Sequence, residues 1–207
     1  MILLTGFEPF GGDTFNPSWE LAQSTAAILE AAGILAHAAL LPCVFETAPI
    51  VLNDLLKQHS PDLVISLGLA AGRNALSLEK VAINHLDARI PDNAGEQPID
   101  KPVVTDGPNA YFSTLPLKRV LQEINGQGSA LRVEVSLTAG SFVCNQVFYA
   151  LMHALAGQTR IRGGFIHVPV LEQDSASLVD YAQALASICR MSLETHVEPQ
   201  ISAGHLH

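Results

Sequence analysis

Short apolar runs alternate with helix-like segments along most of the chain, and this alternation limits the choice of fold more than any other feature. Strand-like runs are expected at residues 2–6, 34–41, 62–68, 76–84, 131–137 and 164–171. Helical periodicity is expected at residues 16–33, 47–59, 117–126 and 175–193, and in the segment that follows Cys144. Such alternation favours an α/β domain with a mainly parallel sheet between helices.

Composition predicts one domain over residues 1–207 and excludes several classes of partner. The chain is 48% hydrophobic, which is enough for one sizeable core. Its net charge of −9, with 11 Lys and Arg against 20 Asp and Glu, argues against a nucleic-acid or anionic-lipid surface. No apolar run is long enough to span a bilayer. The stretch from about residue 196 has no periodicity and is expected to form a frayed tail.

The N-terminal segment and the number of cysteines indicate the cellular compartment of the protein. The segment 1–12 begins apolar, lacks basic residues and soon breaks at Pro and Gly, so it is interpreted as a first strand and not as a signal peptide. Three cysteines are too few for a disulfide framework and suit a reducing cytosol. A cytoplasmic location is therefore expected.

One long segment interrupts the alternation. Residues 83–116 are polar and rich in proline, and loops of this length inside a domain are often functional. An ordered loop near a site is the favoured interpretation, and a flexible surface excursion is the alternative that composition leaves open.

Three glycine-containing segments follow predicted strands, at residues 6–12, 68–73 and 138–145. Ligands bind beyond the carboxyl ends of the strands in open α/β sheets. If the preceding strands are parallel, these segments share one edge and frame a single pocket.

Cys144 lies where the strand pattern of 131–137 gives way to a helix. A helix N-terminus stabilises a thiolate, and its free N–H groups suit a developing oxyanion, so Cys144 is a candidate nucleophile. The alternative is a structural cysteine, because free cysteine is among the most buried residue types. Ser141 is a weaker candidate, since its surroundings lack the second glycine of G-x-S-x-G. Cys43 and Cys189 lie in apolar patterns and are expected in the core.

His167 is a polar residue inside an apolar strand, so it needs a partner if it is buried. A backbone carbonyl is one candidate partner, and a thiol that the imidazole activates is the other. His85 is a weaker competitor. A carboxylate that orients the imidazole could come from any of four residues, and spacing does not choose among them: Glu79, Asp87, Asp92 and Asp100. No metal-ligand or phosphate-loop spacing occurs.

Several long segments together resemble the pyroglutamyl peptidase I family of cysteine peptidases, also called pyrrolidone-carboxylate peptidases. They are "TGFEPFGGDTFNPSWE", "LPCVF", "EKVAINHLDARIPDNAGEQPID", "DGPNAYFSTLP", "TAGSFVCNQVFYALMH" and "RGGFIHVPVLEQ". They occur in the family's order and cover most of the chain to about residue 175.

The resemblance implies a three-layer α/β/α sandwich with a mainly parallel, mixed central sheet. It implies an enzyme that removes an N-terminal pyroglutamyl residue from peptides through an acyl-enzyme and needs no cofactor or metal. Cys144 would be the nucleophile, His167 the general base and acid, and Glu79 the residue that orients His167. The lactam pocket maps onto Phe7, Phe10, Ile90, Phe142 and Val143. Arg89 matches a position near the family's site, and family members are commonly intracellular homotetramers.

The chain departs from the family pattern in a few places. Leu69 and Ala71 replace Gln and Gly of the common G-Q-A-G-G-R, and Ser141 and Gln146 replace Thr and His. The first pair puts polar contacts near the site in doubt and motivates an alternative function, a non-catalytic protein that binds pyroglutamyl peptides. A transferase such as a nucleoside phosphorylase is a third hypothesis, which the lack of a basic phosphate-binding cluster disfavours.

Overall fold

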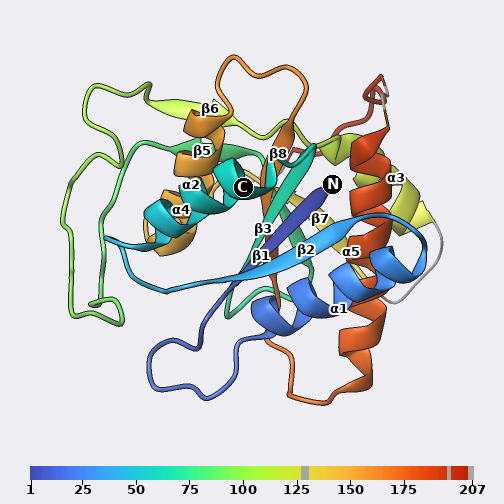
Figure 1. Ribbon diagram of the computed structural model, residues 1–207, viewed down its shortest axis with the longest axis horizontal. Helices are drawn as coiled ribbons and strands as arrows, with labels where there is room; N and C mark the ends of the chain where they lie inside the picture. Colours follow the sequence, from blue (N-terminus) through green and yellow to red (C-terminus); the bar gives the residue numbers. More distant parts are fainter. Residues whose placement is uncertain (127–130, 195–196, 205–207) are drawn as a thin grey trace.

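Six strands form the central sheet of the protein, shown as a computed structural model in Figure 1, in the order β2-β1-β3-β8-β4-β7. The structure describes residues 1–126, 131–194 and 197–204. The strands of this sheet are β1 Ile2–Phe7, β2 Ala36–Leu41, β3 Leu63–Leu69, β4 Leu76–Glu79, β7 Val133–Ser136 and β8 Arg162–Val168. The predicted α/β architecture with a mainly parallel, mixed sheet is confirmed.

Strand direction divides this sheet into two blocks. Strands β2, β1, β3 and β8 are parallel to one another, whereas β4 and β7 are parallel to each other and β4 is antiparallel to β8. The expectation that Cys144 follows a strand parallel to β1 and β3 is therefore wrong. The local pattern of residues 131–137 specifies a strand, but the direction of β7 depends on its pairing with β4, which no local pattern encodes.

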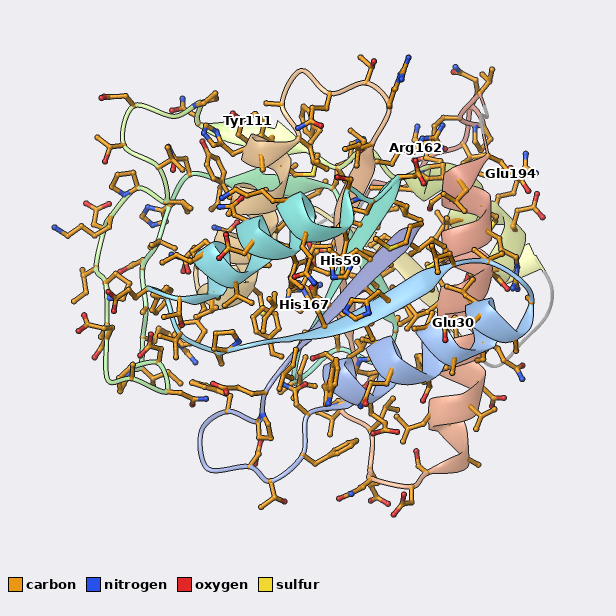
Figure 2. All side chains as sticks on the ribbon, viewed as in Figure 1. Glu30, His59, Tyr111, Arg162, His167 and Glu194 are labelled. Carbon is orange, nitrogen blue, oxygen red and sulfur yellow. The ribbon has the colours of Figure 1, made fainter. Side chains whose placement is uncertain are left out.

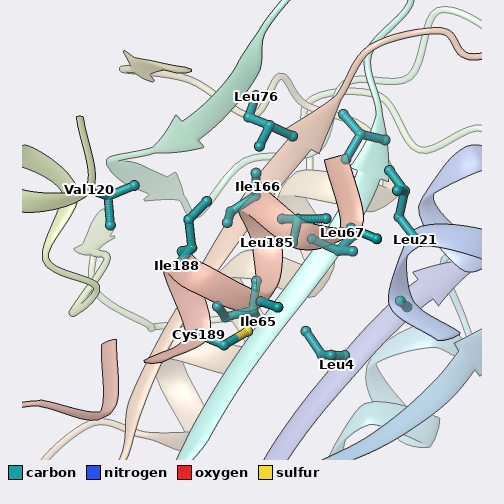
Figure 3. Packing of buried hydrophobic residues seen from close by; sticks show 14 of the residues in the cluster. Leu4, Leu21, Ile65, Leu67, Leu76, Val120, Ile166, Leu185, Ile188 and Cys189 are labelled. Carbon is teal, nitrogen blue, oxygen red and sulfur yellow. The ribbon is translucent and has the colours of Figure 1, made fainter. Parts of the chain in front are cut away.

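Helices cover both faces of the sheet (Figure 1). Helices α1 Pro17–Ala31, α3 Leu117–Gly126 and α5 Ala176–Leu193 pack on one face, and α2 Ala48–His59 and α4 Val143–Ala154 pack on the other. Figure 3 shows the first face, where Leu67 and Ile166 of the sheet meet Leu185 and Ile188 of α5. Cys189 is fully buried there, as predicted.

The ends of α1 follow from its sequence. Asn16 is the N-cap, and its side-chain oxygen accepts a hydrogen bond from the Ser18 N–H at 3.1 Å. Pro17 stands at the first helical position, where no N–H is needed. Gly33 follows the C-cap with φ +77°, a conformation that glycine adopts without steric cost. These features were predicted and are confirmed.

The segment 76–84 is extended as expected, but it divides at Lys80 between two sheets. Strand β5 Val81–Ile83 leaves the central sheet and pairs antiparallel with β6 Ala110–Phe112, which the sequence analysis placed in a loop. The long segment between β5 and β6 is thereby closed at its base, so both of its ends are fixed.

The described part of the C-terminal segment, residues 197–204, has no helix or strand. The Glu198 carboxylate accepts hydrogen bonds from the backbone N–H groups of Lys118 and Arg119, at 3.3 and 2.9 Å, in the first turn of α3. A carboxylate in this position satisfies N–H groups that have no partner within the helix. The remainder of the expected tail lies outside the described residues. Among the helices described, none is both long and apolar enough to cross a membrane.

Candidate active site

A cavity of about 270 Å³ lies between the loop after β1, the carboxyl end of β3 and the start of α4. Its lining residues are Phe7, Phe10, Asp13, Phe15, Asn16, Cys43, Leu69, Ala139, Phe142, Cys144 and His167. The lining is mainly apolar with a few polar groups, which is typical of a small-molecule site. Larger hollows elsewhere on the described part of the molecule are lined by neither cysteine nor histidine.

Cys144 is the second residue of α4, so it lies in the first turn of the helix as predicted. Its sulfur is held tightly against strand β3. A Cβ atom built on Gly68 would come within 2.9 Å of the Cys144 Sγ and 2.7 Å of the Phe165 ring. Gly68 is also the β3 residue paired with His167 in β8. The absence of a side chain at position 68 therefore lets the sulfur reach the sheet beside the histidine.

His167 and Glu79 form a buried pair at the centre of the molecule, where Figure 2 labels the histidine. The imidazole Nδ1 lies 2.7 Å from the Glu79 Oε1. Because Nδ1 is engaged, Nε2 is the ring nitrogen left to exchange protons in the cavity. Within the described part of the chain, no hydrogen bond joins the thiol to the imidazole, a bond that often tightens only when substrate is present.

Burial raises the pKa of the Cys144 thiol well above its ordinary value, and Cys43 and Glu79 add to the increase. The residue's own backbone N–H and the Arg73 guanidinium oppose the shift but do not overcome it. The expectation that the helix N-terminus gives a lowered thiol pKa is therefore wrong, because desolvation outweighs the helix end. Burial thus favours the neutral thiol, so we expect a base to remove its proton when it reacts.

Aromatic rings form one wall of the cavity. The Phe142 ring lies 5.2 Å from that of Phe10 and 4.9 Å from that of Phe45, measured between centroids. Phe7, Phe10 and Phe142 line the cavity, in line with their predicted places. Val143 is fully buried behind the cavity, and Ile90 is half exposed on the long loop, so neither contributes to the lining.

The long loop is ordered beside the cavity, as favoured from the sequence. The Asp92 carboxylate accepts hydrogen bonds from the Phe45 N–H at 2.7 Å and from two N–H groups of its own loop. Asn93 donates to the Glu8 Oε1 at 2.9 Å, and the same oxygen accepts from the Cys43 N–H at 3.0 Å. Two carboxylates thus tie three loops together around the cavity.

The other candidate residues have partners elsewhere. Ser141 donates its hydroxyl to the Asp87 carbonyl at 2.8 Å, and His85 pairs with Asp100 at 3.7 Å on the loop. Arg89 is exposed and does not line the cavity. Of the four carboxylates considered, Glu79 is the one that contacts His167.

Sequence reasoning missed three features of the site. Arg73 forms an ion pair with Glu79, with Nη1 and Oε1 2.6 Å apart. Phe15 lines the cavity, and so does Cys43, which is buried as predicted but faces the same space as Cys144. An arginine that ends a glycine-containing turn was the available signal for Arg73. Among the described residues, no group of three or more potential ligands is arranged to hold a metal ion.

A thiol, an imidazole and a carboxylate gathered at one small cavity define the class of hydrolases that use a cysteine nucleophile. The comparisons with known proteins agree. The family model described as pyroglutamyl peptidase matches residues 1–204. The chain therefore belongs to the pyroglutamyl peptidase family.

Individual relatives are similar over nearly the whole chain. A pyrrolidone-carboxylate peptidase of Escherichia fergusonii is 46% identical over 197 residues, which cover 95% of this chain and 90% of that protein. One from Pseudomonas fluorescens is 53% identical over 173 residues, 84% of this chain and 80% of the relative. The crystal structure of pyroglutamyl peptidase I from Bacillus amyloliquefaciens superposes with a TM-score of 0.87 at 40% identity, with 98% of each chain covered. The predicted family and the expectation of a peptidase are confirmed.

Proposed function

We propose that this protein removes an N-terminal pyroglutamyl residue from peptides, with Cys144, His167 and Glu79 as its catalytic triad. The observation that carries the proposal is the 2.7 Å contact between Glu79 and His167 at the cavity where the Cys144 sulfur lies against Gly68. Membership of the pyroglutamyl peptidase family supplies the substrate class.

The reaction begins with the neutral thiol that burial favours. His167 Nε2 takes the thiol proton as the sulfur attacks the carbonyl carbon of the pyroglutamyl residue. The charged imidazolium is stabilised by Glu79, whose Oε1 accepts from Nδ1. The backbone N–H groups at the start of α4 suit the oxyanion of the tetrahedral intermediate.

Three further proton transfers complete the cycle. The C–N bond breaks as His167 returns its proton to the leaving amine, which leaves the pyroglutamyl group attached to Cys144 as a thioester. His167 then removes a proton from a water molecule that attacks this thioester. The C–S bond then breaks and His167 gives this proton to the departing sulfur, so the products are free pyroglutamate and the regenerated thiol.

The aromatic walls suit the substrate's ring. A pyroglutamyl residue is a small, flat lactam without an ammonium group, so it fits an apolar slot that the Phe10 and Phe142 rings wall on one side. Its ring N–H and C=O need hydrogen-bond partners in that slot, and an unpaired buried polar group costs about 1–3 kcal/mol. A site built for the lactam therefore rejects proline, which lacks the ring carbonyl.

A direct test compares wild type with Cys144→Ala on a pyroglutamyl chromogenic amide and on the matching prolyl amide. We expect turnover of the pyroglutamyl amide by wild type alone and little turnover of the prolyl amide by either protein. Full activity of Cys144→Ala would exclude this mechanism. Binding of the pyroglutamyl amide without hydrolysis by wild type would favour the non-catalytic alternative that Leu69 and Ala71 motivate.

On family membership we also propose that the protein is a cytoplasmic homotetramer. Its cysteines are free, which suits a reducing compartment. Light scattering coupled to size-exclusion chromatography measures the assembly, and a monomer at micromolar concentration would contradict the proposal.

A further inference from the structure

Arg73 binds the carboxylate that holds the catalytic imidazole. It stands in the turn between β3 and β4, and its Nη1 lies 2.6 Å from the Glu79 Oε1. Its Nη2 donates to the Thr138 carbonyl oxygen at 3.0 Å, in the loop that leads to α4. The Arg73 side chain is 27% exposed, whereas the Glu79 side chain is fully buried. One side chain therefore connects the carboxylate to the loop that precedes the nucleophile.

The two donors converge on a single oxygen. Both Arg73 Nη1 and His167 Nδ1 contact the Glu79 Oε1, and Oε2 is buried without a hydrogen-bond partner among the described residues. Arg73 is thus the cation that offsets the negative charge of a carboxylate removed from water. Without it, burial would favour the protonated form of Glu79.

The protonation state of Glu79 decides which ring nitrogen of His167 carries the proton. An ionised carboxylate only accepts hydrogen bonds, so it keeps the proton on Nδ1 and leaves the Nε2 lone pair free. A protonated carboxyl can donate to Nδ1 and would place the proton on Nε2. In that tautomer the imidazole has no lone pair with which to remove the thiol proton.

We infer that Arg73 is a positioning residue of the catalytic triad: it keeps Glu79 ionised and thereby keeps His167 in the tautomer that activates Cys144. The inference rests on the proposed triad and adds a fourth member to it. Arg73 does not line the cavity, so it acts through Glu79 and not on the substrate.

The positive charge of Arg73 also affects the pKa of the Cys144 thiol. The groups that influence the pKa of the Cys144 thiol are Cys43, Glu79 and Arg73, and His167 shares the cavity with them. Asp13 lines the outer part of the same cavity, and the Lys80 ammonium is directed elsewhere, over the Phe112 ring. Among these neighbours Arg73 is the one whose charge lowers the thiol pKa. Its loss favours the protonated form of each nearby group, so the pH needed for activity should rise.

The test measures kcat and KM against pH for wild type, Arg73→Gln and Arg73→Lys. We expect Arg73→Gln to lower kcat at pH 7 by about 10- to 100-fold and to leave KM within about 3-fold. The acidic limb of its kcat/KM profile should move upward by about one pH unit. Arg73→Lys cannot make both contacts, but it keeps the positive charge. Most of the activity and the wild-type acidic limb should therefore be retained.

Arg119→Gln is the matched control, because it removes another arginine–glutamate pair, with Arg119 Nε and Glu123 Oε1 3.1 Å apart on α3 and away from the cavity. Its pH profile should equal that of wild type. If Arg73→Gln is poorly folded, the test depends on Arg73→Lys. A kcat/KM profile like that of wild type supports the role of the charge, and an inactive Arg73→Lys overturns it.

An unshifted acidic limb in a folded Arg73→Gln would overturn the inference, because a merely structural role changes activity without changing the pH dependence. Failure of the triad itself is distinguished by Cys144→Ala. If that variant is active, the proposed function is wrong; if it is inactive while Arg73→Gln has a wild-type profile, only the role of Arg73 is wrong.

Discussion

The two faces of the central sheet are built from the same strands but carry different chemistry. On the face covered by α1, α3 and α5, the strands present buried aliphatic residues such as Leu67, Leu78 and Ile166 (Figure 3). One position further along two of these strands, the opposite face presents Glu79 and His167, both buried. Side chains alternate between faces in a strand, so one sequence specifies an aliphatic face and a second face, called here the polar face, on which buried polar groups lie among apolar residues such as Leu3 and Phe165.

The polar face contains more than the triad. Thr5 donates its hydroxyl to the Ser66 Oγ at 2.9 Å, and Ser77 donates to the Glu134 Oε1 at 2.6 Å, so these buried hydroxyls have partners. The aliphatic face therefore supplies much of the stability. On the opposite face, buried polar groups lower the stability that burial provides, but they supply the reactive groups. Substitutions on the two faces should therefore separate activity from stability.

The largest effect is expected from His167→Ala on the polar face. Loss of the base should reduce kcat by about 10³-fold or more, because triad members act as a unit. The free energy of unfolding should fall by only about 1–3 kcal/mol, because Arg73 remains as a partner of the buried Glu79 carboxylate. Steady-state kinetics and urea unfolding of the same preparation measure both quantities. A variant that unfolds but keeps its specific activity would contradict the division of roles.

The adjacent residue provides the opposite case. Ile166→Ala removes a fully buried side chain from the aliphatic face and should lower the free energy of unfolding by about 2–5 kcal/mol. The kcat/KM of the folded fraction should stay within about twofold of wild type. Chemical denaturation gives the first number, and activity at low temperature gives the second. A large fall in kcat/KM with unchanged stability would show that the two faces are not independent.

Gly68→Ala tests the close approach of the sulfur to the sheet. The added methyl group would lie 2.9 Å from the Cys144 Sγ and 2.7 Å from the Phe165 ring, so the sulfur or the ring must move. We expect kcat to fall about 10- to 100-fold, since small displacements of a reacting atom are costly. Gly11→Ala is not a matched control, because Gly11 has φ +68° and an alanine in that conformation would be strained. Gly126→Ala, at the end of α3 with open space around it, should be nearly wild type. Unchanged kcat in Gly68→Ala would show that the sulfur is not confined there.

The last prediction concerns thiol reactivity in the free protein, without any substitution. Because burial raises the pKa of the Cys144 thiol, its alkylation by iodoacetamide should accelerate by about tenfold per pH unit from pH 7 to pH 9, without a plateau. Cys189, fully buried on the aliphatic face with a pKa raised to about 12, should stay unmodified. Peptide mapping by mass spectrometry follows each site. A plateau near pH 6 would indicate a preformed thiolate–imidazolium pair and contradict the neutral resting thiol.

The sequence was sufficient for the elements and for most of the site. Periodicity located five helices and the strands of the central sheet, and Asn16 with Pro17 predicted the start of α1. The direction of β7 and the division of 76–84 at Lys80 were not predictable, because strand pairing is decided by residues distant in sequence. The same limit explains why the three-residue strand β6 was missed.

For the site, spacing alone left four carboxylates as partners for His167, and the resemblance selected Glu79. Arg73 escaped notice because its contacts are made by the far end of a long side chain, which no pattern of neighbouring residues records. The raised pKa of Cys144 was also missed. The sequence shows that Cys144 lies at the start of a helix, but its burial depends on the packed structure.

The most direct test of the account is to find the substrate's acyl group on the enzyme. Wild type is mixed with a pyroglutamyl amide, quenched in acid during turnover, and digested for mass spectrometry. The account predicts one pyroglutamyl group, carried by the peptide that contains Cys144 and absent from Cys144→Ala. An adduct on Ser141 or Cys43, or rapid hydrolysis by Cys144→Ala, would contradict it.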